Sequence, residues 1–124
     1  MKKCKEAFQA HVEISLGPQD GGQNGFVQVP KGKCLVIDYV SGEAFMPTGQ
    51  KALFGVITTG GGTQVRHYLG TLAAGGFGGL DYFWVSTPVH IYADPGSQVT
   101  LRADRDIANG NALFRMSLSG HFQP

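Results

Sequence analysis

The sequence predicts an all-β protein. Short runs of alternating apolar and polar residues recur along its 124 residues, Gly/Pro turns separate them, and no segment shows a convincing helical period. A chain of this length forms one domain in most cases. We therefore expect a single domain over 1–124, built as an antiparallel two-sheet sandwich of about eight strands in jelly-roll or Greek-key order. A closed barrel is the alternative, and residues 1–5 are expected to form a frayed tail.

Five strands are expected in the first 70 residues, with loops at 17–25 and 41–50. Residues 34–40 are apolar nearly throughout, which predicts a central strand covered on both faces, with Asp38 on the side that reaches solvent. Gly55 indicates a bulge or a close approach of another backbone segment. The five predicted strands are 8–16, 26–29, 34–40, 52–59 and 63–69.

A glycine-rich segment and an aromatic run follow. Residues 70–79 contain five glycines, which predicts a mobile loop or a tight crossing between sheets. Residues 82–85 form the most aromatic stretch of the chain and need cover on both faces.

Residues 89–102 have the pattern of strand, turn and strand. In the turn at 94–97, Pro95 sets φ at the first central position and Gly96 can take a positive φ at the second, as a type II turn requires. The last strand is expected at 112–122. It and the first strand are the longest alternating runs, so we expect them to pair.

Composition excludes some partners and favours others. Ten basic and nine acidic side chains leave a net charge of +1, so no field of one sign draws nucleic acid or an anionic membrane. No apolar run approaches the roughly 18 residues needed to span a bilayer. The 15% of charged residues and the 19 glycines suit a homo-oligomer that hides part of its surface.

The start of the chain and its two cysteines indicate in which cellular compartment the protein is expected. The opening MKKCKEAF has no apolar segment of the kind a signal peptide needs. We expect a cytoplasmic protein if the sequence is complete, and a secreted or periplasmic one if a signal peptide was removed. Cys4 and Cys34 either form a disulfide, worth roughly 3.5 kcal/mol by chain entropy, or remain separate thiols.

Aromatic residues supply one candidate binding surface. Trp84, with Tyr82 and Tyr92, would offer a platform that stacks on the C–H face of a sugar ring and leaves the hydroxyls to polar neighbours. The alternative is that Trp84, the single tryptophan, fills the core of the sandwich.

An acidic and amide-rich loop is the second candidate. Asp104, Asp106, Asn109 and Asn111 place four oxygen-bearing side chains within eight residues, with Arg105 among them. Calcium takes six to eight oxygen ligands, so the loop is a candidate calcium site, with Asp104 and Asn109 available to a sugar. The same residue types are also common in hairpin loops.

Catalytic motifs are absent from the sequence. It has no G-x-S-x-G, no Walker loop, no HExxH and no cysteine pairs at zinc spacing. The four histidines are scattered, although His11 and His121 would lie near each other if the end strands pair. Asp38 or His67 would suggest catalysis only if buried and coupled to another charge.

Three segments together resemble a group of small bacterial β-sandwich proteins whose role is not established. They are VPKGKCLVIDYVSG (29–42), VHIYADPGSQVTL (89–101) and SLSGHF (117–122). This resemblance implies the fold and brings no catalytic residues. The loop at 104–111 is similar to the calcium and sugar loop of small calcium-dependent galactose-binding bacterial lectins, which implies calcium and a carbohydrate as ligands.

We therefore expect a non-enzymatic module that binds carbohydrate or another small molecule through loops at one end. The alternative is a structural protein that forms a homo-oligomer without a small ligand. The third hypothesis is an enzyme of unrecognised type.

Overall fold

The computed structural model describes residues 4–123, and it confirms the all-β prediction. Within that range there are nine strands and no helix, hence none that could cross a membrane. The strands are β1 (Ala7–Leu16), β2 (Gly22–Gln28), β3 (Cys34–Pro47), β4 (Ala52–Gly60), β5 (Thr63–Leu69), β6 (Leu72–Phe77), β7 (Leu80–Ala93), β8 (Gln98–Arg105) and β9 (Ala112–Gln123). Residues 1–3 of the expected tail lie outside the described residues.

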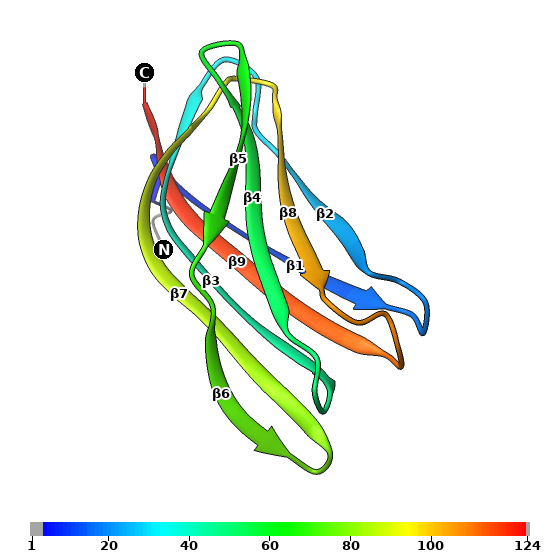
Figure 1. Ribbon diagram of the computed structural model, residues 1–124. Helices are drawn as coiled ribbons and strands as arrows, with labels where there is room; N and C mark the ends of the chain where they lie inside the picture. Colours follow the sequence, from blue (N-terminus) through cyan, green and yellow to red (C-terminus); the bar gives the residue numbers. More distant parts are fainter. Residues whose placement is uncertain (1–3, 124) are drawn as a thin grey trace.

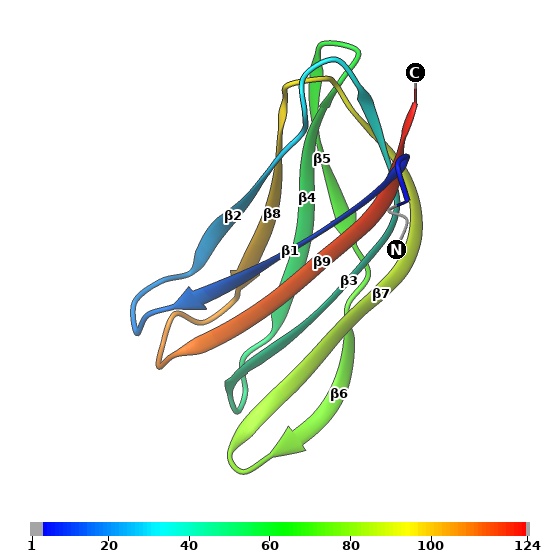
Figure 2. The same cartoon turned by 180° about the vertical axis from the view of Figure 1, so that it is seen from behind.

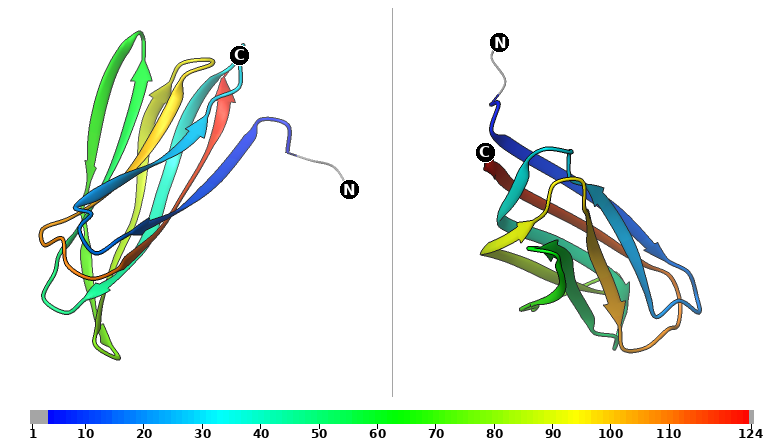
Figure 3. Two further views of the ribbon diagram at one scale, coloured as in Figure 1. Left: turned by 90° about the vertical axis from the view of Figure 1, so that its right-hand side faces the viewer. Right: turned by 90° about the horizontal axis from the view of Figure 1, so that it is seen from above.

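The strands form two antiparallel sheets, shown as two layers in Figures 1 and 3. The five-stranded sheet has the order β1-β9-β3-β7-β6, and the four-stranded sheet has the order β2-β8-β4-β5. Neither closes on itself, so the alternative of a closed barrel is wrong. The core lies between the sheets, where Phe54 of β4 meets Phe114 of β9 edge to face at 5.3 Å between ring centroids. Burying each ring contributes about 2–3 kcal/mol.

The predicted pairing of the two end strands is confirmed. β1 and β9 pair antiparallel over ten residues, from Ala7 opposite His121 to Leu16 opposite Ala112. The predicted proximity of His11 and His121 is wrong, because His11 lies opposite Ser117. Four residue pairs separate the two histidines, about 13 Å along the ladder.

Three expected loops are partly strand. Residues 22–25 belong to β2, residues 41–47 belong to β3, and the glycine-rich segment contains β6. A bulge at Asp38 hides the continuation of β3: Ile37 and Val40 both face the core, so the alternation changes phase there. β6 escapes detection because its small residues show no alternation.

β7 joins the aromatic run to the first arm of the predicted hairpin in one strand of 14 residues. Pro88 lies within it. β6 pairs with β7 only as far as Trp84, so Pro88 sits where β7 has a sheet neighbour on one side only, as proline requires. β6 and the beginning of β7 project beyond the other strands (Figure 1). Nine strands result instead of about eight.

The backbone requires glycine at two positions. Gly96 has φ of 73°, and the N–H of Ser97 donates to the carbonyl of Asp94, which confirms the predicted turn. At Gly120 a Cβ would lie 2.0 Å from the carbonyl oxygen of Val36, so β9 can approach β3 there only without a side chain.

Cys4 and Cys34 are free thiols, so the bridged alternative is wrong.

Candidate functional site

The outer face of the five-stranded sheet carries its side chains in rows that cross the strands. Figure 2 shows β1, β9, β3 and β7 side by side. One row, here the Trp84 row, runs from Glu13 on β1 through Arg115 on β9 and Glu43 on β3 to Trp84 on β7. The rows arise because no bulge interrupts the strand pairs in this part of the sheet. The outward-facing residues of neighbouring strands therefore lie directly opposite one another.

The next row consists of three serines and one histidine and is here called the serine row. It contains His11 on β1, Ser117 on β9, Ser41 on β3 and Ser86 on β7. The Ser41 and Ser117 hydroxyl oxygens lie 2.8 Å apart, at hydrogen-bonding distance. Tyr39, in the following row, makes a hydrogen bond to Ser86 through its hydroxyl.

Glu43 is held in place from two sides. Its Oε2 accepts a hydrogen bond from the Tyr82 hydroxyl at 2.5 Å, and its Oε1 accepts one from Nη1 of Arg115 at 3.3 Å. Arg115 also faces Glu13, with 3.7 Å between Nε and the carboxylate. The hydrogen bond to Glu43, together with partial desolvation, raises the pKa of Tyr82 above its usual value. A carboxylate fixed in this way presents its remaining lone pairs in a defined direction.

Trp84 is exposed, which excludes the core alternative. Its exposed fraction is 47%, and its ring meets Tyr82 edge to face at 5.8 Å between centroids. Tyr82 also packs on Phe45 at 4.5 Å and lies 6.2 Å from Phe77. Contact with Tyr82 restrains the indole while leaving much of it open to solvent.

Two depressions meet on this face. One, of about 350 Å³, is lined by Trp84, Tyr82 and Glu43 among others. The second, of about 480 Å³, is lined by residues that include Gln9 and His11. Ser41 and Ser117 line both depressions, so the serine row forms their common floor. Both volumes lie within the usual range for small-ligand sites.

Tyr92 is not part of this surface. It lies on the same outer face of β7 and is exposed, but it is eight residues from Trp84, about 26 Å along the strand. Its hydroxyl contacts Nε2 of His90 at 2.7 Å. The structure therefore brings Tyr82 and Trp84 together and leaves Tyr92 apart.

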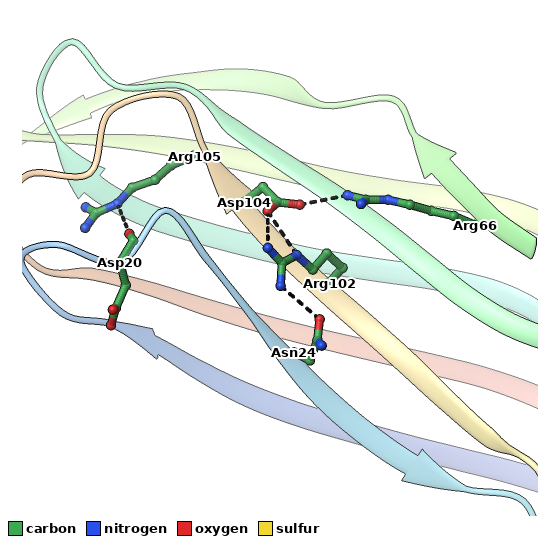
Figure 4. Close-up of polar contacts among 6 residues, drawn as sticks. All are labelled: Asp20, Asn24, Arg66, Arg102, Asp104 and Arg105. Carbon is green, nitrogen blue, oxygen red and sulfur yellow. Dashed lines mark hydrogen bonds and ion pairs between the residues drawn. The ribbon is translucent and has the colours of Figure 1, made fainter.

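Asp104 lies on the outer face of the four-stranded sheet, whereas Trp84 belongs to the five-stranded sheet. Figure 4 shows the side chains that bind Asp104. Its carboxylate accepts hydrogen bonds from Nη2 of Arg66 at 2.7 Å and from Nε of Arg102 at 2.9 Å. Arg102 also donates to the side chain of Asn24 at 3.1 Å. The Arg66 side chain passes over Gly55, with Nε 3.3 Å from the place of a Cβ. Neither pairing of β4 has a bulge at Gly55, and the group that comes nearest is this side chain and not another backbone.

Arg105 organises the loop in which a calcium site is predicted. Its guanidinium is buried, with 7% of the residue exposed, and it hydrogen-bonds at 2.8–3.2 Å to loop oxygens at the end where three turns lie side by side (Figures 1 and 4). The acceptors are the carbonyls of Gly17, Asp20, Asn109 and Gly110 and the side-chain oxygen of Gln50. These bonds take up main-chain oxygens that a calcium ion would otherwise use.

The four predicted calcium ligands have separate surroundings. Asp104 is bound by arginines, and Asp106 accepts a hydrogen bond from the main-chain N–H of Lys51 at 2.6 Å. The main-chain carbonyl of Asn109 binds Arg105 and Gln50, whereas Asn111 lines a depression beside Phe45. Over residues 4–123 no group of three or more His, Cys, Asp or Glu side chains is placed to hold a metal. Calcium binding by this loop stays a prediction.

The two residues that the sequence suggests for catalysis, Asp38 and His67, lie apart from each other. Asp38, at the bulge in β3, contacts Nδ1 of His121 at 2.7 Å, and both side chains are 45% exposed. Asp38 thus reaches solvent, as predicted. His67 lies on β5 in the other sheet.

The sequence alone does not identify Glu43, Arg115 or the serine row as site residues. The alternation of Phe83, Val85 and Ile91 along β7 is a signal that places Trp84 outward, but the register that sets Glu43 beside it has no local signal. The chain matches no protein-family model, and no curated protein matches it significantly.

Proposed function

We propose that the protein binds neutral carbohydrate on the outer face of its five-stranded sheet, with Trp84 as the stacking platform. The observation that carries this proposal is an exposed indole directly opposite a fixed carboxylate, Glu43, and beside a row of hydroxyls. An indole face attracts the C–H face of a pyranose, whereas Glu43, Ser41 and Ser86 offer hydrogen bonds to its hydroxyls.

The charges of this face favour a neutral ligand. The Trp84 row holds two carboxylates, Glu13 and Glu43, against the single guanidinium of Arg115. The net negative charge opposes anionic sugars. The site is an open surface, in contrast to the loop site expected from the sequence.

The strand order supports a jelly roll as the finer description of the fold. With β6 set aside, eight strands divide into β1-β9-β3-β7 and β2-β8-β4-β5. The first and last strands pair, and consecutive strands alternate between the sheets except for the β4–β5 hairpin, as in a jelly roll made of two Greek keys.

Calorimetric titration with a panel of neutral sugars tests the function. Trp84→Ala should lower the affinity about 10- to 100-fold, the range for loss of an aromatic anchor. Glu43→Gln should also weaken binding. Tyr68→Ala, which removes an exposed tyrosine from the other sheet, is the matched control and should leave affinity unchanged. If Trp84→Ala and Tyr68→Ala behave alike, the proposal is wrong. Repeating each titration with added calcium tests the predicted calcium loop.

Assembly into a homo-oligomer remains the second candidate, favoured by β6. This edge strand exposes Leu72 and Phe77, at 64% and 67%, and residues 70–80 carry no charge. Exposed apolar edges without charged residues tend to pair with other strands. Sedimentation of the wild type and of Leu72→Lys would detect such pairing as a dimer that the variant loses.

A further inference from the structure

We infer that the ligand is a chain of two or more sugar units that lies along the serine row, across the strands. This inference rests on the proposed function and names its ligand class: an extended neutral glycan in place of a single sugar.

The floor is low because its side chains are small. Ser86, Ser41 and Ser117 stand in consecutive strands, and the hydrogen bond between Ser41 and Ser117 holds two of the hydroxyls in place. A serine hydroxyl has one donor and two acceptor positions, so each oxygen in this pair keeps capacity for a sugar hydroxyl.

Larger side chains border the floor on both sides. Trp84 and Glu43 belong to the row on one side, and Tyr39 stands in the row on the other side. Tyr39 is exposed, and its hydrogen bond to Ser86 fixes its hydroxyl beside the serine row. The two depressions meet above Ser41 and Ser117 and together form a groove parallel to the rows, with Trp84 in the wall of one depression and Tyr39 in the wall of the other.

The groove is longer than one sugar. From Ser86 on β7 to His11 on β1 it crosses three strand spacings, about 14 Å at the usual separation. A pyranose ring, close in size to one aromatic ring, covers only the Trp84 end. The far depression offers the polar side chains of Gln9, His11 and Ser119 to further units.

A length series tests this inference. Binding is measured calorimetrically with β-1,4-linked glucose, N-acetylglucosamine and galactose oligomers, from the monosaccharide to the hexamer. In the series that binds, affinity should rise at least ~10-fold between the monosaccharide and the longer oligomers and then level off, because each occupied depression adds contacts.

Filling the far depression should remove this gain. Ser119→Leu should return the affinity for long oligomers to about that for the monosaccharide, without changing monosaccharide binding. If Ser119→Leu does not fold, Gln9→Ala on the exposed edge strand is the second variant. It removes a polar side chain of the far depression and should reduce the length dependence. Thr100→Leu, on β8 in the other sheet, is the matched control.

The outcomes separate the two proposals. Equal affinity for monosaccharide and hexamer, or an unchanged length dependence in Ser119→Leu and Gln9→Ala, would overturn the extended-chain inference and leave the proposed function standing. Failure of all three series to bind the wild type would contradict the proposed function itself.

Discussion

Glu43 lies directly opposite Trp84 in the ladder between β3 and β7, and its carboxylate is held by Tyr82 on one oxygen and by Arg115 on the other. An apolar ring and an oriented acceptor therefore stand side by side on an exposed sheet face. This pair is the basis of the proposed carbohydrate site, and its parts can be tested separately.

The emission of Trp84 should report an exposed indole. Because the chain has one tryptophan, fluorescence monitors this position alone. We expect a long-wavelength maximum and strong quenching by acrylamide in the folded protein, close to the values of the unfolded chain. A short-wavelength maximum that resists quenching would mean that Trp84 is buried, contrary to the structure.

Tyr82 should lose its proton at a higher pH than a free tyrosine. Its hydrogen bond to Glu43 raises its pKa in the folded state, whereas the unfolded value is about 10. The stabilisation is present below the unfolded pKa and is lost as pH rises through the folded one. In Glu43→Gln the tyrosinate absorbance should develop at lower pH than in the wild type. Glu13→Gln, which leaves the Tyr82–Glu43 hydrogen bond intact, should behave as the wild type.

Replacing Arg105 should destabilise the protein strongly. Arg105→Leu leaves loop carbonyls at Gly17, Asp20 and Gly110 without their buried donor, and we expect a loss of about 3–5 kcal/mol in the free energy of unfolding. Urea denaturation measures it. Lys51→Leu removes an exposed cation and should change stability by no more than ~0.5 kcal/mol. Similar midpoints for both variants would show that Arg105 does not hold the loops together.

Gly120 should not tolerate a side chain. A Cβ at this position would overlap the Val36 carbonyl, so Gly120→Ala forces β9 away from β3 and should cost about 3 kcal/mol. Gly70→Ala is the control, because its Cβ would meet nothing within 4 Å. It should leave the thermal midpoint equal or slightly higher. Equal midpoints for Gly120→Ala and the wild type would contradict this close approach.

The sequence predicts the frame of this fold well where alternation is uninterrupted. The first and last strands alternate over their whole length, and their pairing follows. The bulge at Asp38 changes the phase of β3, so a strand that continues to Pro47 is mistaken for a loop after Val40. β6 has too few large side chains to show a pattern.

The candidate site was less predictable because it depends on neighbours distant in sequence. Trp84 and Tyr82 were identified by residue type, and the structure places them together. Glu43 joins them only through the register of β3 with β7, which no local pattern encodes. Residue type suggests Asp104 as an oxygen ligand for calcium, but Arg66, from a different strand, binds its carboxylate.

The most direct test of the carbohydrate site is a fluorescence titration of Trp84 with the tetramers of the three β-1,4-linked series. Stacking of a sugar on the indole should produce a saturable change in emission with at least one series. Glu43→Gln should show a weaker change than the wild type, and Tyr68→Ala should show the same change as the wild type. An emission that ignores every sugar, with or without calcium, would contradict carbohydrate binding at Trp84.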